Sequence, residues 1–95
     1  MRAARIGAGG ALLRVERRGN RLGHPRIGIS VPARLGAAVV RNRVRRRLRV
    51  VAGRRLPSLG SFDLVIVARP PAAGATSLEL GAALDQGLGR IGARA

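Results

Sequence analysis

The sequence predicts an α+β fold in which a single small sheet is packed with helices. Two short segments with alternating apolar residues, 11–18 and 26–31, come first, and a helical segment at residues 37–52 follows them. An almost continuous apolar run at residues 62–68 then precedes a second helical segment that starts at Ser77. The order strand, strand, helix, strand, helix is typical of an α+β protein, and 95 residues suffice for one domain.

The first thirty residues predict a flexible end followed by a β-hairpin. Residues 1–10 are rich in Gly, Ala and Arg and follow neither a helical nor a strand period. We therefore expect a flexible N-terminal segment at 1–10 and a single domain over 11–95. Leu13 and Val15 share one side of the first strand, and Ile27 and Ile29 share one face of the second. The turn residues at 19–25 predict that these two strands form a hairpin.

The segment 37–52 predicts an amphipathic helix. Its apolar residues recur at helical spacing and form the expected core stripe, which consists of Val40, Val44, Leu48 and Val51. Gly36 is a permissible N-cap, and Gly53 is expected to end the helix.

The second half of the chain predicts a strand and a closing helix. The run FDLVIVA at 62–68 is bounded by turn residues and predicts a central strand that is covered on both faces. From Ser77, a reasonable N-cap, apolar residues again recur at helical spacing, at Leu80, Leu84, Leu88 and Ile91. Three glycines lie in this helix, Gly81, Gly87 and Gly89, and each costs about 1 kcal/mol relative to alanine, so packing must hold it together.

Positive charge is concentrated in the first helix. Six of the eleven residues at 39–49 are arginine, and no acid lies at 37–52. Arginines three or four apart repel one another, at about 0.2–0.5 kcal/mol per pair. The whole chain has 19 basic residues and 4 acids, a formal charge of +15. Such a field suits a polyanionic partner. All 19 cations are arginine, which favours forked phosphate contacts but equally fits a GC-rich coding bias.

Other residue types indicate no catalytic or metal site in the protein. The four acids are scattered along the chain, at Glu16, Asp63, Glu79 and Asp85, and the single histidine, His24, has no partner pattern. One Phe in the whole chain is too few for a base-stacking platform. The absence of cysteine and of long apolar runs fits a cytoplasmic protein that does not bind membranes.

Residues 35–49, LGAAVVRNRVRRRLR, resemble the signature of the protein component of bacterial ribonuclease P, whose core is Arg-Asn-Arg followed by a basic cluster. The flanking segments RIGISV and DLVIVARP resemble strands of that family, and SLELGAAL resembles its closing helix. The resemblance spans about residues 11–91. It implies a left-handed crossover of the first helix between parallel strands, against the usual right-handed preference.

The resemblance also implies a function and a set of partners. The chain is expected to bind the catalytic RNA of ribonuclease P, one protein per RNA, and to assist removal of the 5′ leader from precursor transfer RNA. The RNA would be the catalyst and would hold Mg²⁺, while the protein would bind no cofactor alone. The RNA-binding residues implied are Arg34, Arg41, Asn42, Arg43, Arg45, Arg46, Arg47 and Arg49. Asn42 is open to two interpretations, a local backbone cap or a direct RNA contact.

One departure from the family and one alternative function remain. Family members begin with a helix bearing aromatic residues that helps to bind the leader, and residues 1–10 have no counterpart of it. An upstream start and a true loss of this helix both remain open, and leader-binding residues stay unassigned.

The alternative function is that of a ribosomal-type structural RNA-binding protein, which shares the charge and size but does not need the Arg-Asn-Arg signature between these two strands.

Overall fold

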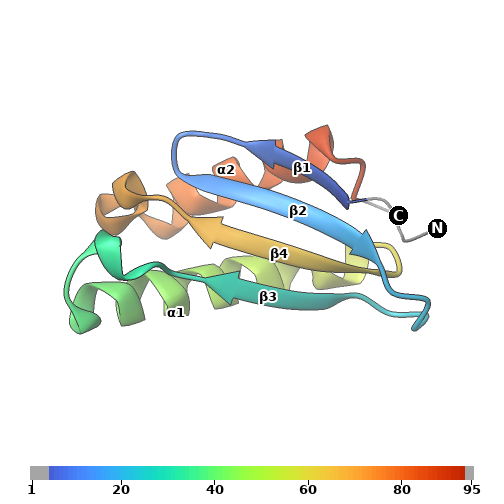
Figure 1. Ribbon diagram of the computed structural model, residues 1–95, viewed down its shortest axis with the longest axis horizontal. Helices are drawn as coiled ribbons and strands as arrows, with labels where there is room; N and C mark the ends of the chain where they lie inside the picture. The colour runs from blue at the N-terminus through green and yellow to red at the C-terminus, as the bar shows by residue number, and fades with distance from the viewer. Residues whose placement is uncertain (1–4, 94–95) are drawn as a thin grey trace.

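The computed structural model describes residues 5–93, which form a four-stranded sheet with two α-helices on one of its faces (Figure 1). The strands are β1 (Arg5–Gly9), β2 (Leu13–Gly19), β3 (Arg26–Ser30) and β4 (Phe62–Ala68). The helices are α1 (Ala38–Arg55) and α2 (Ser77–Arg90), with short 3-10 segments η1 (Ala33–Leu35), η2 (Leu56–Ser58) and η3 (Pro70–Gly74). The α+β class with one small sheet is confirmed.

The strand order β1-β2-β4-β3 places β4 inside the sheet, antiparallel to β2 and parallel to β3. The predicted hairpin between β2 and β3 is therefore wrong, because β4 lies between them. Ile66 of β4 is opposite Val15 on one side and Ile29 on the other. The most apolar strand gains the most burial in this central place. The chain at 20–25 consequently passes over the start of β4 instead of forming a tight turn.

Residues 5–9 form the edge strand β1, so the expectation of a flexible segment at 1–10 is wrong for these five residues. They pair antiparallel with β2, and Ala8 lies opposite Val15. A short strand with glycine at two of its five positions has no hydrophobic period, and its pairing with β2 is what forms it. Residues 1–4 lie outside the described part of the chain.

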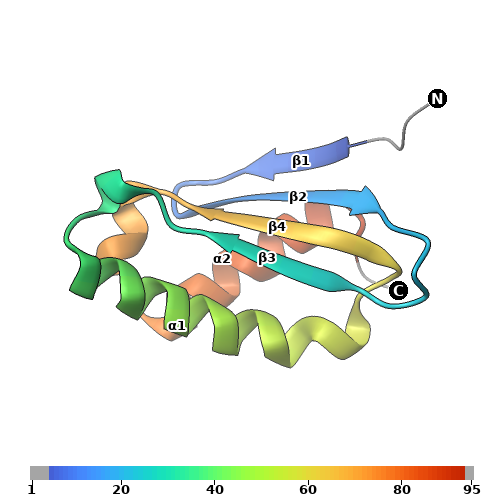
Figure 2. The same ribbon diagram turned by 60° about the horizontal axis from the view of Figure 1, so that its bottom comes forward.

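Helix α1 connects the parallel neighbours β3 and β4. Figure 1 looks onto the open face of the sheet, with α1 behind it, and Figure 2 turns the helix layer into view. In Figures 1 and 2 the chain leaves β3, returns through α1 behind the sheet and enters the parallel neighbour β4, and this path is left-handed. The handedness agrees with the family resemblance and not with the usual preference.

The core lies between the sheet and the two helices. Val44 and Leu48 of α1 and Leu80, Leu84 and Leu88 of α2 are fully buried, as their spacing predicted, whereas Val40 is only half-buried. In β4, buried residues such as Leu64 and Ile66 alternate with Val65, which is 37% exposed. The prediction that this strand is covered on both faces is wrong, because both helices pack on the same face.

The helix ends differ from the sequence expectations in three places. Helix α1 continues past Gly53 because Arg55 is bonded to the Val51 carbonyl of its own helix and to the Asp85 carboxylate of α2. Its N-cap is Ala37, not Gly36, and has no side-chain bond. The N-cap of α2 is Thr76, not Ser77, because Thr76 and Glu79 form a reciprocal capping box.

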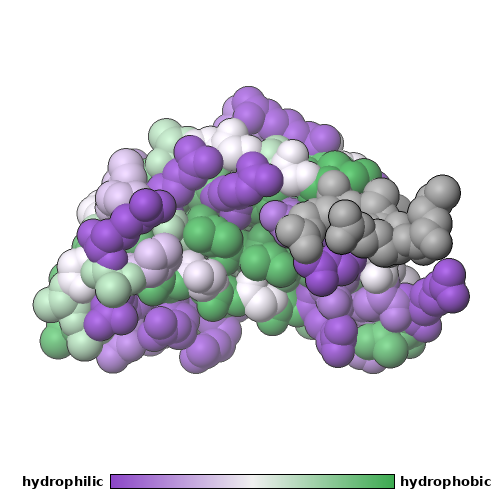
Figure 3. Space-filling model, in the orientation of Figure 1, coloured by the Kyte–Doolittle hydropathy of each residue, from purple (hydrophilic) through white to green (hydrophobic). Residues whose placement is uncertain are grey.

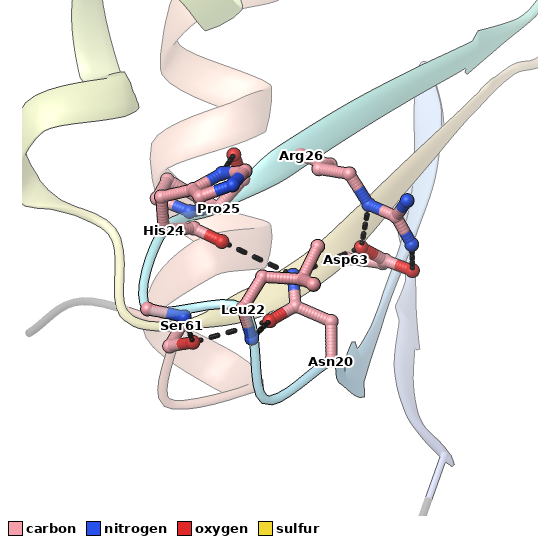
Figure 4. A network of polar contacts seen from close by, with 8 residues as sticks. Asn20, Leu22, His24, Pro25, Arg26, Ser61 and Asp63 are labelled. Atoms are coloured by element: carbon pink, nitrogen blue, oxygen red, sulfur yellow. Dashed lines mark hydrogen bonds and ion pairs between the residues drawn. The ribbon is translucent and has the colours of Figure 1, made fainter.

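A polar network fixes the 20–25 connection over the start of β4 (Figure 4). The Arg26 guanidinium donates to both carboxylate oxygens of Asp63 at 2.8 Å, and the Asn20 amide donates to Asp63 Oδ1 at 3.0 Å. The Gly23 amide donates to Ser61 Oγ, which holds the far end of the connection. The Arg26 bonds, followed by the Asn20 bond, lower the pKa of Asp63 from its ordinary value of 3.8 to about 2.

The lowered pKa predicts how acid weakens the fold. A depressed pKa stabilises the folded state above the unfolded value, and this contribution is lost as the pH falls from 3.8 towards about 2. We expect the stability advantage of the wild type over Asp63→Asn to be constant above about pH 5 and to shrink through this window. Urea unfolding of both proteins across the range measures it. If the stability advantage of the wild type does not change with pH, the Arg26–Asp63 ion pair does not stabilise the folded state.

Candidate nucleic-acid interface

Helix α1 presents one continuous arginine surface to the solvent. Arg41, Arg45 and Arg49 are four residues apart and share the flank turned away from α2, and Asn42 and Arg46 lie beside them on the outer side. Arg46 and Arg49 are exposed, and Arg41 and Arg45 are partly exposed. Arg34, also exposed, lies in η1 just before the helix. Figure 2 shows the helix along the outer border of the molecule, where a large partner can reach it.

The acids of the chain are engaged elsewhere. Glu16 pairs with Arg14 on β2, Asp63 pairs with Arg26, and Glu79 belongs to the α2 capping box. Asp85 pairs with Arg55, in the last turn of α1 and beyond the arginine signature. Since α1 itself contains no acid, the charge of its outer surface is not neutralised within the helix.

Asn42 contacts a neighbouring arginine. Its Oδ1 accepts a hydrogen bond from Arg45 Nη1 at 2.9 Å, on the exposed side of the helix. Asn42 does not cap the backbone of the helix, because the N-cap of α1 is Ala37 and no side chain is bonded to it. The amide instead orients the guanidinium of Arg45.

Arg43 and Arg47 lie on the opposite flank of α1, which faces η3 and α2. Arg43 Nη2 donates to the Ala73 carbonyl at 3.1 Å, and Arg47 Nη1 donates to the Ala75 carbonyl at 2.7 Å. Both bonds are partly buried and join segments about thirty residues apart in the sequence. The signature is thus divided between two flanks, which the sequence does not distinguish.

The open face of the sheet is a second basic surface, which the sequence patterns did not predict. Val65 and Val67 of β4 are not covered by the helices, and Figure 3 shows apolar surface in the middle of this face with hydrophilic side chains around it. A methyl group added at Gly9 would lie 2.8 Å from Arg69 Nη2, and one added at Gly7 would lie 2.6 Å from Arg14 Nη2. The glycines of β1 therefore leave room for two guanidinium groups. Gly7 and Gly9 are two residues apart and so lie on the same face of β1, and this spacing is the sequence feature that could have indicated the surface.

Two other kinds of site have no support in residues 5–93. No group of three His, Cys, Asp or Glu residues is placed to hold a metal ion. Neither helix in this range combines the length and apolar character needed to cross a membrane.

A small α+β domain whose crossover helix bears an unneutralised arginine surface is built to face a polyanion. The model of one protein family, described as Ribonuclease P, matches residues 3–92. The chain therefore belongs to the ribonuclease P protein family.

Relatives and solved structures agree with this assignment. The ribonuclease P protein component of Beutenbergia cavernae is 50% identical over 72 residues, which are 75% of this chain and 60% of that protein. The component of a Nocardioides species is 48% identical over 69 residues, 72% of this chain and 59% of that protein. The chain thus spans about 60% of the length of these relatives.

The fold agrees as well. The Staphylococcus aureus RNase P protein superposes with a TM-score of 0.82 at 29% identity, over 90% of this chain and 79% of that one. The Thermotoga maritima RNase P protein, at 22% identity, shares the fold with a TM-score of 0.78 over 86% and 79% of the two chains.

Proposed function

We propose that this chain acts as the protein subunit of ribonuclease P, binding the catalytic RNA and assisting removal of the 5′ leader from precursor transfer RNA. The observation that supports it best is the arginine surface of α1, which lies within the family signature and is left without acids. In this proposal the catalyst is the RNA, one protein binds each RNA in the cytoplasm, and Mg²⁺ is held by the RNA and not by the protein.

The physical role of the protein is to shield phosphates. A folded RNA repels itself unless cations screen its backbone, and arginines that contact phosphates replace part of that screening. Guanidinium groups suit this role because their planar forks match phosphate oxygens. The RNA should therefore need less Mg²⁺ when the protein is bound.

The decisive experiment titrates Mg²⁺. A ribonuclease P RNA is incubated with a precursor transfer RNA, with and without this protein, and cleavage of the leader is followed. We expect the Mg²⁺ concentration for half-maximal cleavage to fall when the protein is present. A ribosomal-type structural protein would leave the midpoint unchanged, and that result would reject the proposal.

Asn42 offers a test of how α1 meets the RNA. We expect Asn42→Asp to bind the catalytic RNA up to about fivefold more weakly than Asn42→Ala, because a carboxylate adds a charge that repels phosphate at close range. Filter binding or fluorescence anisotropy at one fixed salt concentration measures the ratio. If both variants bind equally well, the outer side of the helix at Asn42 does not face phosphate.

The open face of the sheet is our candidate for contact with the leader. It is a surface where apolar Val65 and Val67 lie between strands that bear arginines, a combination suited to bases and phosphates of a single strand. We expect Arg69→Ala to reduce the preference of the reconstituted enzyme for precursor over mature transfer RNA, because the mature form lacks the leader. Arg45→Ala, on the other surface, should leave this preference unchanged. An unchanged preference in Arg69→Ala would remove Arg69 from the leader site.

A further inference from the structure

Two signature arginines contact the protein itself. Arg43 and Arg47 reach from α1 to the chain that connects β4 to α2, where they donate to the carbonyls of Ala73 and Ala75. This connector begins after Arg69, passes through η3 and ends at Thr76, the N-cap of α2. In addition to the bonds inside η3, two local backbone bonds close its ends, from the Ala72 amide to the Arg69 carbonyl and from the Ala75 amide to the Ala72 carbonyl.

The environment of Arg43 limits what else its guanidinium can bind. Its Nε is buried without a hydrogen-bond partner, and the adjacent Nη2 donates to Ala73. Side-on recognition of a phosphate uses the Nε and Nη2 donors of one guanidinium together. Because Nε has no solvent access and Nη2 has an internal acceptor, Arg43 does not offer this fork to a ligand. Arg46 and Arg49, by contrast, are exposed.

We infer that Arg43 and Arg47 are positioning residues that hold the β4–α2 connector against α1, whereas phosphate contact by α1 is made by Arg45, Arg46 and Arg49. Arg41 is left out of the second set because its Nε donates to the Gly36 carbonyl at 3.2 Å. One stretch of arginines then has two functions, divided by helix flank. Through the connector, Arg43 and Arg47 also set where Arg69 leaves β4 and where α2 begins. The assignment of the second set rests on the proposed RNA-binding function, and the assignment of the first does not.

The first part of the experiment measures the connector in the free protein. Arg43→Ala and Arg47→Ala are compared with Arg45→Ala and Arg46→Ala, which remove the same side chain from the same helix. Hydrogen exchange of the Ala72 and Ala75 amides is followed, because both amides are bonded within the connector. We expect exchange at least tenfold faster in the first pair than in the wild type, and unchanged in the second pair, while amides in the middle of β4 stay protected in all four.

The second part measures binding of the same proteins to the catalytic RNA over a range of salt. Each lost phosphate contact lowers the slope of log K against log salt by about 0.7–0.9. We expect this loss in Arg45→Ala and Arg46→Ala and an unchanged slope in Arg43→Ala and Arg47→Ala. A slope reduced by a full contact in Arg43→Ala or Arg47→Ala would overturn the inference, and so would unchanged exchange at Ala72 and Ala75.

Milder variants cover the case in which an alanine variant does not fold. Arg43→Gln removes the charge but keeps an N–H donor, and Arg47→Lys keeps both the charge and a donor. Arg43→Gln should retain the wild-type salt slope although it has lost a charge, and a lowered slope would overturn the inference. If none of the four alanine variants alters the slope while exchange rises in the first pair, the positioning role stands and the proposed RNA surface of α1 fails.

Discussion

Replacing Arg45 and Arg46 together by alanine is expected to lower the slope of log K against log salt for the catalytic RNA by about 1.4–1.8, two contacts' worth. Both side chains lie on the outer part of α1, and no acid of that helix competes for them. Affinity at moderate salt should fall with the slope, because release of counterions from the RNA drives this kind of binding. Titrations at several salt concentrations give both quantities.

The matched control is Arg18→Ala/Arg54→Ala. This variant loses the same two charges from exposed positions outside the signature, one in β2 and one in the last turn of α1. A small change in slope is expected, because these positions lie apart from the outer surface formed by Arg41, Arg45, Arg46 and Arg49. Equal losses in the two double variants would mean that the overall field of the protein, and not the signature, determines recognition.

Two glycines of α2 should respond to alanine in opposite directions. A methyl group at Gly87 would lie 2.6 Å from Cγ2 of Val15, a side chain that is buried under the helix. Overpacking of this kind costs about 1–3 kcal/mol, which exceeds the gain of up to about 1 kcal/mol in helix propensity. Gly87→Ala should therefore destabilise the fold. Gly89→Ala should stabilise it by up to about 1 kcal/mol, because nothing lies within 4 Å of the added methyl group.

Urea unfolding of the two alanine variants and the wild type tests this pair, since all three proteins have the same charge. The midpoint should fall for Gly87→Ala and rise for Gly89→Ala, with equal slopes of free energy against urea. A Gly87→Ala protein as stable as the wild type would mean that α2 can move away from β2 without loss, and the contact with Val15 would then be unimportant.

Local periodicity was enough to predict most of the elements and the basic surface. The apolar spacing of both helices, the alternation in the strand at 26–30 and the apolar run at 62–68 all depend on neighbours within one turn or one strand. The arginine density of α1 is likewise local, and the Arg-Asn-Arg signature led directly to the family. Each of these features is contained in a short stretch of sequence.

Pairing and packing decided the rest, because they depend on residues far apart in the chain. Strand β1 exists through its pairing with β2, and β4 separates β2 from β3 because it pairs with both. Gly87 and Gly89 look alike in the sequence, yet only Gly87 lies against Val15. In the same way, Arg43 and Arg46 are both arginines of α1 and look alike in the sequence. Arg43 donates to the Ala73 carbonyl, whereas Arg46 is exposed. The sequence determined which residues are basic or apolar, and the tertiary structure determined what each of them touches, because a contact depends on the position of both partners.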